Sequence, residues 1–173
     1  TVGESGVLAA SGGNFGIAVA YAARALGHKA EIFVPATSST AKIERIRHEG
    51  ADVRIVPGYY ADAAAACRER AAESGALFMH PYDQLEVVAG QGTIGPELDQ
   101  QVPDLTTVLV AFGGAGLIGG IASWFAGRAR VIGVETEACA TLHSALASGR
   151  PVDVDVGGVG IFPRSAVRAR PRS

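Results

Sequence analysis

The sequence predicts an α/β fold in which βαβ units build a parallel sheet. Short runs rich in Val, Ile, Leu and Ala alternate along the chain with segments of helical length, and glycines stand at many of the junctions. Strands that alternate with helices favour parallel pairing through right-handed crossovers. The 173 residues are 48% apolar, which is enough for one or two compact units with a sizeable core.

Twelve elements follow from this alternation. The predicted strands are residues 7–10, 30–34, 52–56, 77–79, 107–111 and 130–134. The predicted helices are residues 15–26, 41–49, 60–73, 85–99, 117–125 and 138–147.

The first helix, FGIAVAYAARAL, is apolar around almost its whole circumference as far as Arg24, so we expect it to be buried. Asn14 stands at its predicted N-cap position, and Gly27 is expected to end it. Gly50 and Gly75 are expected to end the next two helices in the same way.

The chain is expected to divide near Pro103 and Asp104. Residues 1–103 would form a first α/β unit and residues 104–160 part of a second. Residues 161–173 are predicted to be a disordered tail, because the last ten residues hold four arginines and no acidic residue. A nucleic-acid-binding arm is the alternative for this tail, although no aromatic residues are interleaved with the arginines.

Composition excludes several classes of protein. A net charge of −2 argues against a nucleic-acid-binding protein, and no apolar run reaches the roughly 18 residues of a membrane span. Two cysteines, Cys67 and Cys139, cannot form a disulfide framework, which indicates a cytoplasmic protein. The four histidines have no metal-binding spacing. The start lacks an initiator Met, so we expect the sequence to begin inside a longer chain.

Two glycine-rich turns share one layout of strand, turn and helix. The first lies in LAASGGNFGIAVA, residues 8–20, and the second in VLVAFGGAGLIGGIA, residues 108–122. Glycines let backbone amides approach a ligand closely, and the following helix presents free N–H groups and the positive end of its dipole. Each turn is therefore suited to a phosphate or a carboxylate. The alternative is that the glycines only permit a tight turn.

The second turn also fits the dinucleotide-binding pattern. Gly114, Gly116 and Gly119 form G-x-G-x-x-G, and Glu135 follows the next strand about 20 residues on, where a ribose hydroxyl needs an acceptor. An NAD-binding oxidoreductase is therefore an alternative function.

Four segments occur in the order typical of one enzyme family. They are SGGNFGIAVAYAARALGHKAEIFVP (11–35), KIERIRHEGADVRIV (42–56), HPYDQLEVVAGQGTIGPEL (80–98) and FGGAGLIGG (112–120). Together they resemble the fold-type II (tryptophan synthase beta-like) pyridoxal-phosphate enzymes. The HPYD form followed by AGQGT is most similar to the branch of threonine and serine dehydratases and serine racemases.

The resemblance implies a set of binding residues. The backbone of a tetraglycine-like loop would hold the phosphate of pyridoxal 5'-phosphate, through Gly113, Gly114, Ala115, Gly116 and Leu117. Asn14 would contact the ring hydroxyl of the cofactor, and Tyr82 and Asp83 would line its mouth. The substrate carboxylate would be bound by Ser11, Gly12, Gly13 and Phe15. Ala115 replaces a glycine of the family, which is tolerable if its φ is negative and unfavourable if φ must be positive.

The resemblance also implies an activity. It favours β-elimination of a hydroxy amino acid such as threonine or serine to a 2-oxo acid and ammonia, in a homodimer or larger homo-oligomer. Racemisation is disfavoured because Gly12 stands where the racemases carry a proton-transferring serine, and Gly12 has no side chain. The divalent metal site of the racemases is also disfavoured, since Thr141 replaces one carboxylate and leaves Glu135 alone.

The Schiff-base lysine of the family does not match any residue here. The lysines are Lys29 and Lys42, and neither falls in the motif that carries the catalytic one. We therefore expect these 173 residues alone to be inactive, either as a segment of a longer enzyme or through a reading frame lost near Gly160. A remnant that still binds the cofactor without catalysis is the remaining alternative.

Overall fold

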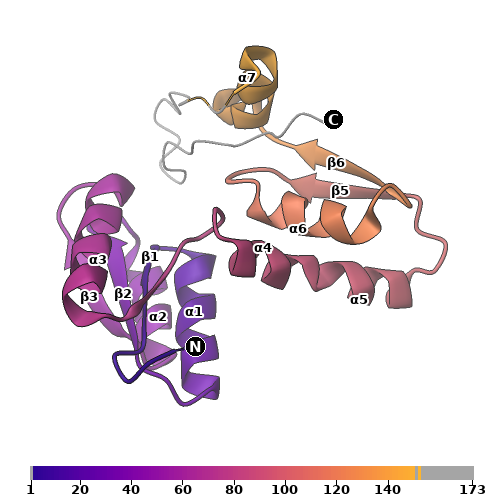
Figure 1. The fold of residues 1–173 in the computed structure, drawn as a ribbon. Coiled ribbons are helices and arrows are strands. Elements are labelled where there is room, and N and C mark those ends of the chain that lie inside the picture. The colour runs from indigo at the N-terminus through magenta and orange to yellow at the C-terminus, as the bar shows by residue number, and fades with distance from the viewer. Residues whose placement is uncertain (1, 151, 153–173) are drawn as a thin grey trace. The chain divides into compact units, whose positions relative to one another are not determined.

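The computed structural model describes residues 2–150 and 152, and it confirms the α/β fold with parallel sheets (Figure 1). All six strands lie where the sequence predicts them, with one residue added at Pro35. The described chain forms two compact units that meet in sequence between Pro81 and Tyr82. Each unit is described by itself.

The first unit is built on a four-stranded sheet in the order β3-β2-β1-β4, in which all neighbours are parallel. The strands are β1 (Val7–Ala10), β2 (Ala30–Pro35), β3 (Asp52–Val56) and β4 (Leu77–Met79). The chain passes from β1 outward to β2 and β3 and then returns to the other side of β1. The direction of strand succession therefore reverses between β1 and β4.

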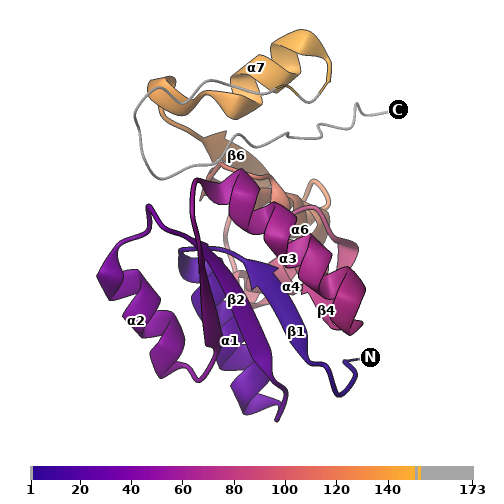
Figure 2. The same ribbon diagram turned by 90° about the vertical axis from the view of Figure 1, so that its left-hand side faces the viewer.

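Helices cover both faces of this sheet. Helices α1 (Asn14–Ala25) and α2 (Thr40–His48) lie on one face, and α3 (Tyr60–Ser74) lies on the other (Figure 2). Because side chains of a strand alternate between faces, β1 supplies Val7 and Ala9 to the α1 side and Leu8 and Ala10 to the α3 side. A strand buried on both faces in this way explains its continuous apolar run.

Helix α1 differs from its prediction in two respects. Only one face is buried, through Gly16, Val19, Ala20 and Ala23, whereas Tyr21 and Leu26 are 57% and 72% exposed within the described chain. The N-cap residue is Gly13 and not Asn14, which is the first residue of the helix. The predicted helix ends are confirmed, since Gly27, Gly50 and Gly75 all have positive φ within two residues of the last residue of α1, α2 and α3.

The second unit contains a parallel pair of strands, β5 (Thr107–Ala111) and β6 (Arg130–Val134). Its helices are α4 (Leu85–Gly92), α5 (Ile94–Gln101), α6 (Gly116–Phe125) and α7 (Thr141–Ser148), with a short 3-10 turn at Glu137–Cys139. Val110, Ile121 and Phe125 are at the centre of its core, which joins β5 to α6.

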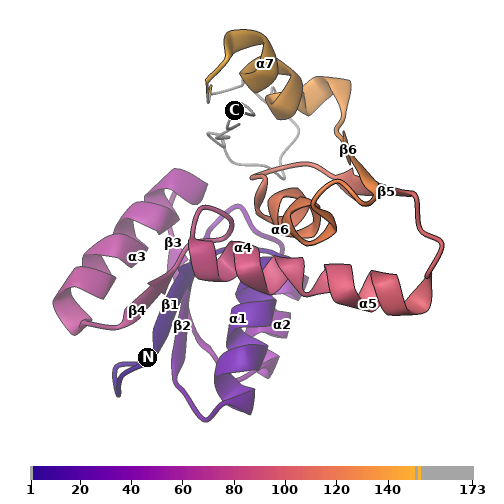
Figure 3. The same cartoon turned by 45° about the vertical axis from the view of Figure 1, so that its right-hand side comes forward.

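The single helix predicted over residues 85–99 is wrong, because the structure has α4 and α5 in succession (Figure 3). Pro96 has no N–H to donate to the carbonyl of Gly92, so the α-helical ladder is interrupted there. Thr93 closes α4 instead, with its N–H and its Oγ1 donating to the Gly90 carbonyl at 3.2 and 2.7 Å. Pro96 then lies in the first turn of α5, where proline is tolerated.

The last helix begins later than predicted, at Thr141 rather than at residue 138. The Glu135 carboxylate accepts hydrogen bonds from the N–H groups of Leu142 at 2.7 Å and His143 at 2.8 Å. These bonds satisfy donors at the start of α7 and so fix where the helix begins.

The domain boundary that we expect near residue 103 stays a prediction. The compact units divide earlier, at Tyr82, since α4 and α5 pack against α6 and belong with β5. The expected disordered tail at 161–173 lies outside the described residues.

Candidate functional site

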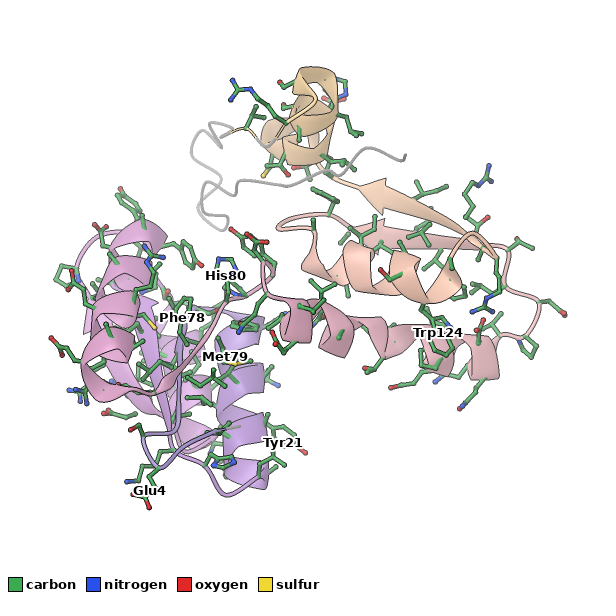
Figure 4. The ribbon with its side chains drawn as sticks, viewed as in Figure 1. Glu4, Tyr21, Phe78, Met79, His80 and Trp124 are labelled. Atoms are coloured by element: carbon green, nitrogen blue, oxygen red, sulfur yellow. The ribbon has the colours of Figure 1, made fainter. Side chains whose placement is uncertain are left out.

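The first candidate turn lies at the point where the strand order reverses. Ser11, Gly12 and Gly13 connect β1 to α1 at the carboxyl edge of the sheet, and His80 follows β4 at the same edge. Figure 4 labels His80 together with Phe78, whose ring meets the imidazole edge-on with centroids 6.3 Å apart. In open α/β sheets, ligands bind outside the carboxyl ends of the strands at such a reversal.

Hydrogen bonds hold this turn in shape and leave some donors unused. The Ser11 N–H donates to the Phe33 carbonyl at 3.0 Å, and the Ser11 Oγ accepts from the Gly13 N–H at 3.2 Å. Within the described chain, the N–H groups of Gly12, Asn14 and Phe15 have no protein acceptor. The turn therefore presents unpaired donors at the positive end of the α1 dipole, as a carboxylate site requires.

Asn14 is exposed, and its side chain does not cap α1. No hydrogen bond to another group in the described residues engages its amide. The side chain is thus available for a ligand, which removes the simpler explanation that Asn14 only starts the helix.

The second candidate turn, Gly113–Gly116, connects β5 to α6. The Phe112 N–H still belongs to the sheet and donates to the Val134 carbonyl at 2.8 Å, and the helical bonds begin with Gly119 N–H to Ala115 O. In the part of the chain that the structure describes, the N–H groups between them, from Gly113 to Ile118, have no backbone acceptor. Successive unpaired amides at a helix start form a concave site for an anion.

The ring of Tyr82 packs directly against this second turn. A β-carbon on Gly114 would overlap the Tyr82 ring, and one on Gly116 would lie 2.9 Å from the Tyr82 Cα. A β-carbon on Gly113, by contrast, would meet no atom within 4 Å. Gly114 and Gly116 are thus required by packing, whereas a side chain at residue 113 would have open space. This arrangement fits a phosphate held by backbone amides.

Ala115 has φ +69° and ψ −11°, in the left-handed region. This is the unfavourable case, and Ala115 carries backbone strain of roughly 1–2 kcal/mol relative to a right-handed conformation. The turn keeps the shape suited to glycine although alanine occupies the position.

The AGQGT segment brings α4 and α6 into close contact. A β-carbon on Gly120 would lie 2.5 Å from the Gly92 nitrogen, and one on Gly92 would lie 3.2 Å from the Gly120 carbonyl oxygen. Only glycines permit this approach of two backbones. Sequence reasoning identified the segment as part of a family pattern and missed this packing role, because the sequence does not show that Gly92 of one helix lies against Gly120 of another.

Glu135 does not fit the role of a ribose acceptor, because both of its carboxylate oxygens accept N–H groups of α7 and Oε2 also lies 3.4 Å from the Thr141 hydroxyl. The dinucleotide-binding alternative therefore has no free carboxylate at residue 135 to accept a ribose hydroxyl.

Lys29 directly precedes β2 and therefore lies at the amino edge of the sheet, opposite the turn that contains Ser11. No cluster of potential metal ligands occurs within residues 2–150, and none of the helices described there is long and apolar enough to cross a membrane.

Comparison with known proteins gives one consistent result. The model of the family described as "Pyridoxal-phosphate dependent enzyme" matches residues 2–168. An L-threonine ammonia-lyase from Geobacter sulfurreducens is 42% identical over 154 residues, which cover 87% of this chain and 38% of that protein. The biosynthetic L-threonine dehydratase IlvA from Mycobacterium leprae is 40% identical over 184 residues, covering 95% and 43% respectively.

Solved structures give the same fold. The processed form of threonine deaminase isoform 2 from Solanum lycopersicum superposes with a TM-score of 0.83 at 33% identity, covering 95% of this chain and 49% of that one. Maize serine racemase superposes with a TM-score of 0.79 at 29% identity, covering 84% and 45%. The chain thus spans about two fifths of the length of these curated relatives and about half of these structures.

Proposed function

This chain belongs to the family of pyridoxal-phosphate-dependent enzymes, and from that premise we propose that the complete protein deaminates a hydroxy amino acid. The substrate would be L-threonine or L-serine, and the products a 2-oxo acid and ammonia. The observation that carries the proposal is the pair of strand–turn–helix sites with unpaired amides, in a chain 42% identical to an L-threonine ammonia-lyase.

The second turn would hold the cofactor phosphate. The amides of Gly113, Gly114, Ala115, Gly116 and Leu117 supply the donors, and the start of α6 adds the positive end of its dipole. The Tyr82 ring packs against the turn at Gly114. When bound, pyridoxal phosphate draws electrons from the substrate α-carbon, so that loss of the α-proton and then of the β-hydroxyl becomes possible.

The first turn would orient the substrate by its carboxylate. The free N–H groups of Gly12 and Phe15 and the Ser11 hydroxyl are the donors, with the Gly13 amide completing the turn through Ser11 Oγ. Gly12 has no group that moves a proton, which supports elimination over racemisation. The Asn14 amide is free to bond the ring hydroxyl of the cofactor. Neither Lys29 nor Lys42 falls in the family's lysine motif, so the Schiff-base lysine would come from outside these residues.

The test uses the full-length protein that contains this sequence. We expect 2-oxobutanoate from L-threonine or pyruvate from L-serine, formed only with pyridoxal 5'-phosphate bound, and no racemised amino acid. Binding of NAD with no effect of pyridoxal phosphate would contradict the proposal.

A variant of the second turn tests the cofactor site separately from activity. Gly113→Ala adds a methyl group where no protein atom lies within 4 Å, so the fold should be unchanged. If the turn holds the phosphate, the added methyl group should displace the phosphate from at least one amide. Affinity for pyridoxal phosphate should then fall about tenfold or more, since a charge-assisted hydrogen bond is worth roughly 1.5–3 kcal/mol. Gly90→Ala, on α4 and equally open, is the matched control and should leave that affinity unchanged. Equal affinities in all three proteins would contradict the assignment.

We also propose a cytoplasmic location and a homodimeric or larger assembly for the complete protein. Free thiols at Cys67 and Cys139 support a reducing compartment. The resemblance to the dehydratase branch supports the assembly. Light scattering of the full-length protein tests the assembly, and a monomer at micromolar concentration would contradict it.

A further inference from the structure

The loop after β2 brings a hydroxyl group against the first turn. Residues 36–39 connect β2 to α2, and the Ser38 N–H donates to the Pro35 carbonyl at 2.9 Å, which fixes the loop. A β-carbon on Gly12 would overlap the Ser38 Oγ and would lie 3.0 Å from the Ser38 Cβ. The Ser38 hydroxyl therefore fills the volume that a side chain at residue 12 would occupy.

The Ser38 hydroxyl has no hydrogen-bond partner in the part of the chain that the structure describes. Ser38 is half-buried, and among the described residues no donor or acceptor bonds its Oγ. Its neighbour Ser39 is exposed. Next to the Ser38 hydroxyl lies the Gly12 N–H, which has no acceptor within residues 2–150 either. Two donors from two loops thus stand together at the carboxyl edge of neighbouring strands.

We propose that Ser38 is a further substrate-binding residue, whose Oγ–H donates to the carboxylate of the amino acid held by the first turn. This inference rests on the proposed function. Because residue 12 is glycine, there is room beside the first turn for the hydroxyl of Ser38. A β-carbon on residue 12 would overlap the present Ser38 side chain, so only one of the two residues can place a side chain there.

The experiment measures binding of glycine to the full-length protein loaded with pyridoxal phosphate, by calorimetry. Glycine has the carboxylate of a substrate but no β-hydroxyl to eliminate. Ser38→Ala should weaken glycine binding about tenfold, as expected for loss of a hydrogen bond to a charged group. Affinity for pyridoxal phosphate and the unfolding midpoint should not change. Ser39→Ala, one residue along the same loop and exposed, is the matched control and should bind glycine as the unmodified protein does.

A swap of the hydroxyl between the two loops adds a positive test. Gly12→Ser alone should lose glycine binding, because its side chain overlaps Ser38. The double variant Gly12→Ser with Ser38→Gly removes the overlap and returns a hydroxyl from the other backbone, so it should bind glycine more tightly than Gly12→Ser alone.

The outcomes separate the two proposals. Equal glycine affinity of Ser38→Ala and the unmodified protein overturns the role of Ser38 and leaves the proposed function intact. A parallel loss of pyridoxal phosphate affinity or of stability in Ser38→Ala also overturns it, because the residue would then be structural. An unmodified protein that binds neither pyridoxal phosphate nor glycine overturns the proposed function and this inference with it.

Discussion

Replacing Ala115 by glycine should stabilise the protein. Ala115 has φ +69°, and a left-handed conformation costs an L-residue roughly 1–2 kcal/mol. Glycine removes that strain but adds about 0.4–1 kcal/mol of backbone entropy to the unfolded chain. The midpoints of these two ranges, about 1.5 and about 0.7 kcal/mol, predict a net gain of about 0.8 kcal/mol in the free energy of unfolding.

Urea unfolding followed by circular dichroism measures this change. The midpoint should rise without a change in the denaturant slope, because the surface exposed on unfolding is the same. For a chain of this size the melting temperature should rise by about 1–4 °C. Ala122→Gly is the matched control: it makes the same chemical change at an exposed position inside α6, where glycine should cost about 1 kcal/mol. If Ala115→Gly destabilises as Ala122→Gly does, Ala115 is not left-handed in solution and the reasoning fails.

Three further changes test the packing and the titratable groups. Gly120→Ala should lower the free energy of unfolding by about 1–3 kcal/mol, because its β-carbon would lie 2.5 Å from the Gly92 nitrogen. An unchanged midpoint of urea unfolding would refute the close approach of α4 and α6. The hydrogen bond from the Trp124 N–H, and then the Arg128 guanidinium, lower the pKa of Asp99. The ionised carboxylate therefore adds stability above the ordinary carboxyl pKa, and this stability is lost as the pH falls. Asp99→Asn should flatten the fall of the free energy of unfolding below about pH 5, and an unchanged pH profile would contradict this. Burial, with a smaller effect from the Glu31 carboxylate, raises the pKa of Cys67 to about 12. The native thiol should therefore react with a disulfide reagent at pH 8 far more slowly than the thiol of the protein unfolded in urea. Equal rates would contradict its burial.

The strands could be predicted from the sequence because each is a short apolar run between glycine-rich or polar segments. The run Val7–Ala10 is buried on both faces, so no alternation was needed to recognise it. The helix starts were harder, since they depend on hydrogen bonds from outside the helix. Glu135, six residues before α7, determines that start at Thr141, and no pattern within the helix records it.

Tertiary contacts account for the rest. The two turns were recognised from their glycines, but which amides remain free depends on partners such as the Phe33 carbonyl on β2. The contact of Tyr82 with Gly114 and of Ser38 with Gly12 joins residues that are distant in sequence. The residue type of Asn14 favours the N-cap position of α1, whereas the turn places Gly13 there.

The position of β1 inside its sheet determines when, during synthesis of the protein, this strand can be paired on both edges. Val7 pairs with Ala30 on one side and with Leu77 on the other, and the Leu77 N–H donates to the Gly6 carbonyl at 3.0 Å. The strand that leads into the first turn is therefore completed by residues made about 70 positions later. A ribosome-bound chain shorter than this exposes one edge of β1, and such an edge can pair with other chains. Truncation before β4 should thus yield aggregates rather than a smaller folded sheet.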